Sequence, residues 1–206
     1  LGQEPFTLVI EIDAWNSRER DQWGQSQQRR AKGLEPERWH WVYGGTCFRL
    51  DQRTQTDAGG LLMSRGTVMN RGDIDALREQ LFAECLRHGA GRAAEVLVVA
   101  DGAMWIWKLV SDRFATATQR LDYYHASQHL WAVAHALHPE DAPAAHRWIE
   151  PLLKKLKAGR SIKVIAELEG ITKRWRAKQR ATAQSELEYF QTHGDRLDYH
   201  LTKNRS

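Results

Sequence analysis

The chain has 206 residues, of which 42% are hydrophobic and 27% charged, a balance typical of globular proteins and not of disordered ones. Its formal net charge is +4 and its isoelectric point is about 9.2. No apolar run approaches the roughly 20 residues that span a bilayer, so we expect a cytoplasmic protein with no membrane partner. The two cysteines, Cys47 and Cys85, have no CxxC spacing, which argues against a zinc finger or a disulfide framework and predicts buried thiols.

The N-terminal part opens with an apolar strand. Residues 7–12 are mostly aliphatic, and period-two alternation places Val9, Glu11 and Asp13 on one face. We expect this strand to end at Asp13. Residues 16–38 are polar with six basic side chains, which predicts a long, partly helical loop.

A hairpin and a helix follow. Residues 41–50 and 61–70 are strand-like, and the turn-forming residues at 57–60 predict that they join as a hairpin. Residues 73–88 predict a helix, because apolar side chains recur along one face and Gly89 ends the pattern.

The middle of the chain alternates strands with helices. Residues 95–100 form an apolar run typical of a strand covered on both faces, and Asp101 follows it directly. A short helix over 103–110, a strand over 118–122 and a helix over 124–137 come next.

The C-terminal part is predicted to be helical from 140 to 192. We expect breaks near Pro151, Gly159 and Gly170, and an end at Gly194.

This element order predicts an α/β fold. Three antiparallel strands, a crossover helix and a parallel strand are the order of a ribonuclease-H-like mixed sheet, here with a helical insertion. A doubly wound sheet is the competing architecture, but it should not begin with a long hairpin. The predicted domains are a partial ribonuclease-H-like catalytic core over 1–138, a helical basic insertion over 139–194 and the start of a return to the core over 195–206.

Asp13 and Asp101 are the first candidates for chemistry. In a ribonuclease-H-like sheet the first and fourth strands are neighbours, so their ends would bring the two carboxylates together. Mg²⁺ prefers oxygen ligands, and two carboxylates with a substrate phosphate would suit metal-dependent phosphoryl transfer. The alternative is that both aspartates cap turns, since Asp-Gly is a common turn pair.

Asp122, His125 and His129 form an Asp-x-x-His-x-x-x-His pattern. Two histidines four residues apart on a helix could bind zinc together with Asp122. No glutamate stands beside the first histidine, so this is not the metalloprotease pattern, and such pairs are more often packed or solvent-facing.

Basic side chains are concentrated in the second half of the chain. Residues 147–180 hold 11 Lys and Arg against three Glu, a net charge of +8, which is typical of a surface that contacts a polyanion. Contacts to phosphates from such a region hold DNA without reading its sequence, although a solvated helix face is the alternative. The candidate DNA-binding residues, with a tryptophan that could stack on a base, are Lys154, Lys155, Lys157, Arg160, Lys173, Arg174, Trp175, Arg176 and Lys178.

Two segments carry a family resemblance. Val-Ala-Asp-Gly-Ala-Met-Trp-Ile-Trp at 99–107, and Leu-Asp-Tyr-Tyr-His continuing to Trp131, resemble bacterial insertion-sequence transposases of the DDE type related to the Mutator-like group. In that family an Asp-Gly-Ala-x-Trp-Ile segment carries the second catalytic aspartate, matched by Asp101. A Cys/Asp-x-x-His motif follows, matched by Asp122 and His125. The first catalytic aspartate lies on the opening strand and is matched by Asp13, although the family commonly has Asp-Gly there and this chain has Asp-Ala.

The resemblance implies the catalytic region of a DNA transposase, with metal-dependent strand cleavage and strand transfer by in-line phosphoryl transfer. Asp13 and Asp101 would hold Mg²⁺ or Mn²⁺, while Asp122 and His125 would brace the site or contact DNA. The implied partners are the DNA of the element ends and of the target, with a homo-oligomer assembled on DNA.

One catalytic residue of the family has no clear match. The third carboxylate is a glutamate in a Gly-Ser-Gly-x-x-Glu-like segment that residues 1–206 do not contain. We expect it beyond Ser206 in a longer parent protein, which would leave this chain with an incomplete site. The alternative is that Glu167, Glu169 or Glu186 takes its place.

Two other classes stay open. A non-catalytic DNA-binding or assembly protein on a ribonuclease-H-like scaffold would fit the missing carboxylate. A small-molecule α/β hydrolase that uses Asp101 is less favoured, because the sequence has neither GxGxxG after a strand nor GxxxxGK[ST] to cradle a phosphate.

Overall fold

The computed structural model describes residues 4–19, 26–33, 38–57, 59–174 and 177–199. The chain divides into two compact units, which are described in turn: Leu1–Val98 with Trp105–Thr118, and Val99–Met104 with Gln119–Ser206. The predicted division into domains at 138 and 194 stays a prediction. Within the described ranges, no helix combines the length and the apolar character that crossing a membrane requires.

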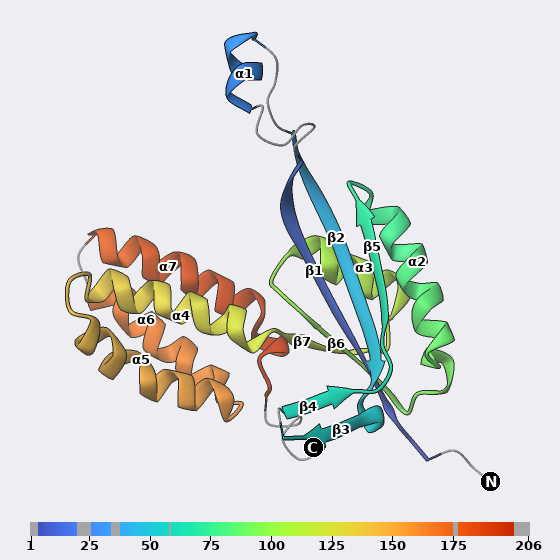
Figure 1. Ribbon diagram of the computed structural model, residues 1–206. Helices are drawn as coiled ribbons and strands as arrows, with labels where there is room; N and C mark the ends of the chain where they lie inside the picture. The colour runs from blue at the N-terminus through green and yellow to red at the C-terminus, as the bar shows by residue number, and fades with distance from the viewer. Residues whose placement is uncertain (1–3, 20–25, 34–37, 58, 175–176, 200–206) are drawn as a thin grey trace. The chain divides into compact units, whose positions relative to one another are not determined.

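The elements form an α/β fold with a mixed five-stranded sheet, which confirms the predicted class (Figure 1). The strand order is β5-β2-β1-β6-β7, and β2 pairs antiparallel with both β1 and β5. The first and fourth strands of this sheet are therefore neighbours, as the ribonuclease-H-like order requires. The five strands are β1 (Thr7–Glu19), β2 (Arg38–Arg49), β5 (Gly66–Arg71), β6 (Glu95–Ala100) and β7 (Thr118–Leu121).

Strand β1 is longer than predicted. The prediction that it ends at Asp13 is wrong, because the antiparallel pairing with β2 continues to Glu19 opposite Arg38. The predicted loop over 16–38 therefore contains the end of β1, the short helix α1 (Ser26–Ala31) and the first residue of β2.

The predicted hairpin is present as the pairing of β2 with β5, but its connection has more structure than expected. A 3₁₀-turn η1 (Leu50–Gln52) leads into β3 (Arg53–Thr56) and β4 (Gly59–Leu62), which form a separate two-stranded sheet. The predicted turn closes this smaller hairpin, so a single strand over 61–70 is wrong: β4 and β5 divide that stretch.

Two helices of the first unit, α2 (Ile74–Arg87) and α3 (Met104–Arg113), pack against the sheet (Figure 1). Helix α2 begins where the Asp73 carboxylate accepts the backbone N–H of Ala76 at 2.9 Å. Its buried side chains recur every four residues: Leu77, Leu81 and Cys85. Gly45 on β2 allows the close approach, because a Cβ atom there would lie 2.7 Å from Leu81 Cδ2. The 3₁₀-turn η2 (Ala90–Arg92) follows α2.

The two cysteines meet in this layer. Cys47 on β2 and Cys85 on α2 are both buried and free of a disulfide, as predicted. A hydrogen bond to Cys47, together with burial, raises the pKa of Cys85. Cys85 is therefore held as a thiol inside the core.

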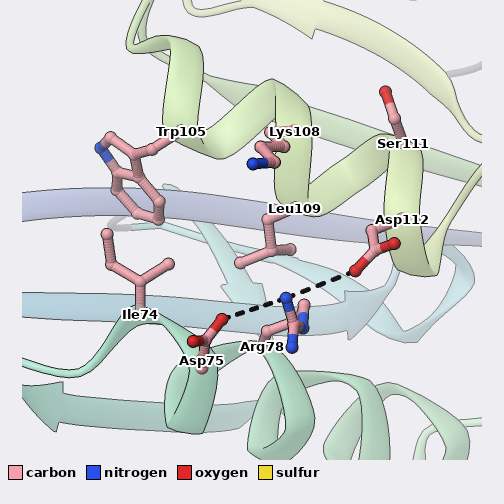
Figure 2. A pocket seen from close by; sticks show the side chains of 8 residues that line it. All are labelled: Ile74, Asp75, Arg78, Trp105, Lys108, Leu109, Ser111 and Asp112. Carbon is pink, nitrogen blue, oxygen red and sulfur yellow. Dashed lines mark ion pairs between the residues drawn. The ribbon is translucent and has the colours of Figure 1, made fainter.

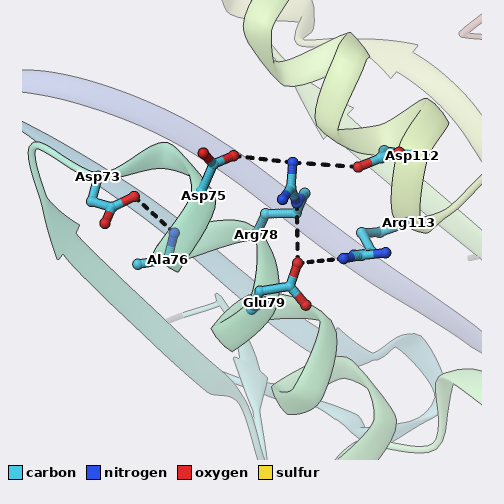
Figure 3. A network of polar contacts seen from close by, with 7 residues as sticks. All are labelled: Asp73, Asp75, Ala76, Arg78, Glu79, Asp112 and Arg113. Atoms are coloured by element: carbon cyan, nitrogen blue, oxygen red, sulfur yellow. Dashed lines mark hydrogen bonds and ion pairs between the residues drawn. The ribbon is translucent and has the colours of Figure 1, made fainter.

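An ion-pair network joins α2 to α3 (Figure 3). Arg78 on α2 lies 3.0 Å from Asp75 and reaches across to Asp112 on α3 at 3.4 Å. Glu79 pairs with Arg113 at the end of α3. The hydrogen bonds from Arg113 and then Arg78 lower the pKa of Glu79, so this exposed carboxylate stays ionised to lower pH than an unpaired glutamate.

The second unit is mainly helical. Its elements after β7 are α4 (Tyr123–Leu137), α5 (Ala142–Lys157), α6 (Ser161–Arg174), α7 (Ala177–Thr192) and the 3₁₀-turn η3 (Gly194–Arg196). Helices α4 and α6 each pack against both α5 and α7. Helix α5 begins where the Asp141 carboxylate accepts the backbone N–H of Ala144 at 2.9 Å. One stripe of apolar side chains along α5 is buried, which is the face that packs on the neighbouring helices. That stripe consists of Ala145, Ile149, Leu152 and Leu156.

Two of the predicted helix breaks are wrong. Pro151 lies inside α5, where the buried Leu152 and Leu156 on its C-terminal side keep the helix packed beyond it. Gly170 lies inside α6, because buried Leu168 and Ile171 flank it. In both places tertiary packing outweighs the local preference of the residue. The predicted break at Gly159 is confirmed between α5 and α6.

Gly45→Val should destabilise the protein by about 1–3 kcal/mol, because the new side chain must occupy space that Leu81 fills. Urea unfolding monitored by circular dichroism measures this change. Gly91→Ala is the matched control, since no atom lies within 4 Å of a Cβ placed there. Equal effects of the two substitutions would contradict the close packing of α2 on β2.

Candidate active site

Two carboxylates stand at neighbouring strand ends in the second unit. Asp101 directly follows the last residue of β6, Ala100, and Asp122 directly follows the last residue of β7, Leu121. The backbone N–H of Asp122 donates to the carbonyl of Ala100 at 2.7 Å. The strand ends therefore lie side by side, and both aspartates are half-buried.

Local hydrogen bonds orient both side chains. Asp101 Oδ1 accepts the N–H of Ala103 at 2.8 Å, which shapes the turn that leads into α3. Asp122 caps α4: its Oδ1 accepts the N–H of His125 at 2.9 Å and lies 3.2 Å from Nδ1 of the same histidine. The structure thus brings Asp101, Asp122 and His125 to the ends of two adjacent strands.

Helix α7 packs directly over the turn after β6. A Cβ atom on Gly102 would lie 2.4 Å from Cε2 of Tyr189 and 2.9 Å from Nε2 of His193. Only a residue without a side chain fits this contact. The glycine of the Asp-Gly pair therefore positions α7 beside Asp101.

Tyr189 has an unusual environment. Its hydroxyl is buried and has no hydrogen-bond partner among the described residues. Burial raises the pKa of Tyr189, and the charges of Asp101, Glu186 and Asp122 raise it further. Three carboxylates thus influence one phenol, which stays protonated at neutral pH.

The side chain of His129 contacts two residues of α7. Its Nδ1 lies 2.6 Å from Oε2 of Glu186, and its ring stacks on Tyr189 with 3.6 Å between ring centroids. The zinc hypothesis for Asp122, His125 and His129 is therefore wrong, because Asp122 caps α4 while His129 pairs with α7. Across the part of the chain that the structure describes, no three His, Cys, Asp or Glu side chains lie close enough to hold a metal ion.

His193 is buried one turn after Tyr189. Burial lowers the pKa of His193, the nearby Arg196 and His129 lower it further, and Asp101 opposes them. Arg196 in η3 also donates from Nε to Oε1 of Gln119 on β7 at 2.8 Å, which ties the end of the helical layer to the sheet.

Tyr189 and His193 were not among the predicted site residues. The signal that could have found them is the helical spacing of Glu186, Tyr189 and His193, which places all three on one side of α7 and of the residue that directly follows it. Nothing in the local sequence says that this face meets the turn after β6.

Asp13 belongs to the first unit and lies within β1. Its side chain is exposed, and its Oδ1 accepts the N–H of Ala14 at 2.7 Å. The predicted pairing of Asp13 with Asp101 stays a prediction, because the two residues belong to units that are described separately.

Some of the predicted DNA-binding residues already contact other side chains of the protein, whereas others are exposed to solvent. Lys154 pairs with Glu150 at 2.7 Å, and Lys155 approaches Glu167 at 3.9 Å. Lys157 lies 6.0 Å from the ring centroid of Tyr123. The side chains of Arg160, Lys173 and Arg174 are exposed, whereas Trp175, Arg176 and the side chain of Lys178 lie outside the described residues.

The chain matches no protein-family model and no curated protein. Among solved structures it is similar to the Drosophila P element transposase strand transfer complex, with 12% sequence identity and a TM-score of 0.34. The match covers 89% of this chain and 49% of that chain, so this chain spans about half the length of the protein it matches.

Gly102→Ala should destabilise the second unit by about 1–3 kcal/mol, since the added methyl group collides with Tyr189 and His193. Urea unfolding gives the change in free energy, with Gly194→Ala as control because space around Gly194 is open. An unchanged stability of Gly102→Ala would show that α7 does not pack on this turn.

The unfolding free energy should fall as the pH is lowered from about 7.5 to about 5.5, because the pKa of His193 is lower in the folded protein than in the unfolded chain. The unfolded state then binds the extra proton, so the contribution is complete above about pH 6.5 and is lost below it. His193→Gln should weaken this dependence in urea unfolding at both pH values. The exposed His135→Gln is the control, and an equal effect of both variants would refute the role of His193.

Proposed function

We propose that this chain carries the catalytic region of a DDE-type DNA transposase, which cleaves and joins DNA strands by metal-dependent in-line phosphoryl transfer. One observation carries the proposal: Asp101 and Asp122 stand at adjacent strand ends, linked by the 2.7 Å hydrogen bond from Asp122 N to Ala100 O. Both aspartates belong to the two segments in which the sequence resembles that family. Carboxylates at strand ends are also where open α/β sheets commonly place their chemistry.

The side chains at these strand ends fit a divalent cation. Among the described contacts, Asp101 and Asp122 each use Oδ1 for a protein hydrogen bond, which leaves one carboxylate oxygen on each without a described partner. Mg²⁺ or Mn²⁺ binds such oxygens together with water and substrate phosphate, and would supply charge stabilisation at the scissile phosphate. In this proposal Asp13 and Asp101 hold the metal, and the part of Asp13 rests on the resemblance alone.

Asp122 and His125 have a positioning role in this proposal. With Asp122 accepting the hydrogen bond from Nδ1–H, the Nε2 atom of neutral His125 is the acceptor. The side chain of His125 is 42% exposed, so Nε2 can reach a DNA group at the strand ends. Asp122 therefore fixes both the start of α4 and the tautomer of the histidine.

The basic side chains of α5 and α6 would hold the DNA backbone. Arg160, Lys173 and Arg174 are exposed at the helix ends, where they can contact phosphates without reading bases. Such contacts are salt-dependent, because each neutralised phosphate releases counterions. DNA of the element ends and of the target, and a homo-oligomer formed on it, are the partners of this proposal.

The test compares Asp101→Asn and Asp13→Asn with the wild-type chain in nicking of supercoiled plasmid in the presence of Mn²⁺. Each substitution should lower the nicking rate by at least about a hundredfold, because it removes a charge that the transition state requires. Asp51→Asn is the matched control, since Asp51 is an exposed aspartate in an ion pair with Arg49. Nicking that is unchanged in Asp101→Asn would refute the catalytic assignment.

A non-catalytic DNA-binding or assembly protein is the second candidate. The observation that favours it is internal pairing: Asp122 caps α4, and Glu186, one of the candidate third carboxylates, is paired with His129. This candidate predicts that the wild-type chain binds duplex DNA without metal, nicks no plasmid, and keeps its affinity in Asp101→Asn.

A further inference from the structure

Strand β2 displays a row of aromatic side chains. Trp39, Trp41 and Tyr43 alternate along the strand and therefore share one face. Trp39 is 59% exposed and Trp41 is 52% exposed, which is unusual for tryptophan. Tyr43 meets the edge of Trp105 on α3, with 5.1 Å between ring centroids and 72° between planes. We call these four residues, all in the first unit, the aromatic row.

The spacing of the row suits stacked bases. Alternate residues on a strand lie about 7 Å apart on the same face, a distance that successive unstacked bases of a single strand can match. Aromatic rings bind bases of any sequence, because every base has a π-face. A row of exposed rings at this spacing is therefore a stacking surface for unpaired nucleotides.

The charge beside the row is positive. Residues 14–18 and 38–50 contain no Asp or Glu. Arg18 on β1 stands opposite Trp39 in the register, with its guanidinium 5.8 Å from the tryptophan ring centroid. Asn16 stands opposite Trp41 and adds a neutral donor. Among the described residues beside Trp39 and Trp41, a phosphate backbone would meet the guanidinium of Arg18 and the amide of Asn16.

The row ends at a pocket of about 560 Å³ between α2 and α3 (Figure 2). Trp105 from α3 faces Ile74 from α2, and Leu109 lies beside them, toward Arg78. Arg78 is engaged by Asp75 and Asp112, as its ion pairs show.

Lys108 places a positively charged ammonium group at this pocket. Its side chain is exposed and forms no ion pair with any described residue. The pocket thus has an apolar side formed by Ile74, Trp105 and Leu109 and a charged side where Arg78 pairs with Asp75 and Asp112. Lys108 adds one ammonium group without an ion pair to a described residue, and the volume is within the range of small-ligand sites.

We propose that the aromatic row binds single-stranded DNA by base stacking, and that the pocket takes the base at the end of the row with Lys108 on its phosphate. This proposal rests on the proposed function in taking DNA as the partner. It assigns single strands to the first unit and, as a further step, leaves duplex DNA to the basic side chains at the ends of α5 and α6, which the proposed function places on the DNA backbone.

The test measures the affinity of the chain for a fluorescein-labelled oligothymidylate and for a duplex of the same length by fluorescence anisotropy. A Trp39→Ala/Trp41→Ala double variant should bind the oligothymidylate at least about fivefold more weakly, because each lost ring removes a stacked base. Its affinity for the duplex should not change. Lys108→Ala should weaken binding of the oligothymidylate and lower the slope of its salt dependence by about one unit.

Trp15→Ala is the matched control. Trp15 is 42% exposed and stands on the opposite face of β1, across from Val42, so its loss should leave both affinities unchanged. Circular dichroism melting curves confirm that each variant is folded.

Unchanged affinity of the double variant for the oligothymidylate, or an equal loss in Trp15→Ala, would overturn the proposal. So would sedimentation showing that the double variant only converts a dimer into a monomer, because the row would then be a protein interface. If the double variant binds the oligothymidylate as tightly as the wild type, while duplex binding is lost in Arg160→Ala/Lys173→Ala, this inference fails and the proposed function stands. If the wild-type chain binds neither probe, both fail.

Discussion

The pairing of β1 with β2 is the constraint on which the first unit depends. It runs from Leu8 opposite Arg49 to Glu19 opposite Arg38 without interruption. Because the register fixes which side chains share a face, it directs Ile12 and Gly45 to the face that α2 covers and Asp13 to the other. A shift by one residue would place Asp13 under α2 and expose the aliphatic side chains, so the same pairing determines the core and the position of the candidate carboxylate.

In the second unit, a single backbone hydrogen bond between two strand ends has the corresponding role. The hydrogen bond from Asp122 N to Ala100 O holds the ends of β6 and β7 together, and Gly102 then admits the side chains of Tyr189 and His193. Sheet, turn and helical layer thus meet around Asp101. His129 and Glu186 satisfy each other, whereas the Tyr189 hydroxyl and the second carboxylate oxygens of Asp101 and Asp122 have no partner among the described contacts. A ligand can recruit the latter groups without rearrangement.

Local chemistry explains which elements could be predicted from sequence. Strand β6 and helices α2 and α4 lie within a residue of their expected ends, because an apolar run or an aspartate cap marks each of them. The predicted ends were wrong where contacts with residues distant in sequence determine the end of an element. Strand β1 continues beyond Asp13 because β2 pairs with it, and helix α5 continues beyond Pro151 because its buried face continues.

In the candidate site too, residues marked by local sequence could be predicted, and residues placed by distant contacts could not. Asp101, Asp122 and His125 could be proposed because they stand at the ends of elements that the sequence itself reveals. Tyr189 and His193 could not, because their relation to Gly102 depends on how α7 folds back over a turn some 90 residues earlier in the chain. The side chains that complete the surroundings of Asp101 are thus products of packing rather than of a motif.

One carboxylate oxygen of Asp122, Oδ1, makes two contacts with His125, one with its backbone N–H and one with its ring. Oδ1 both caps α4 and holds the ring of His125, so any cation or phosphate-bound water that takes this atom must first release the first turn of the helix. His129, one turn further along α4, is itself joined to α7 through Glu186. A ligand that takes Oδ1 is therefore linked to order in the first turn of α4, whereas a ligand on the second oxygen of Asp122 leaves the cap in place.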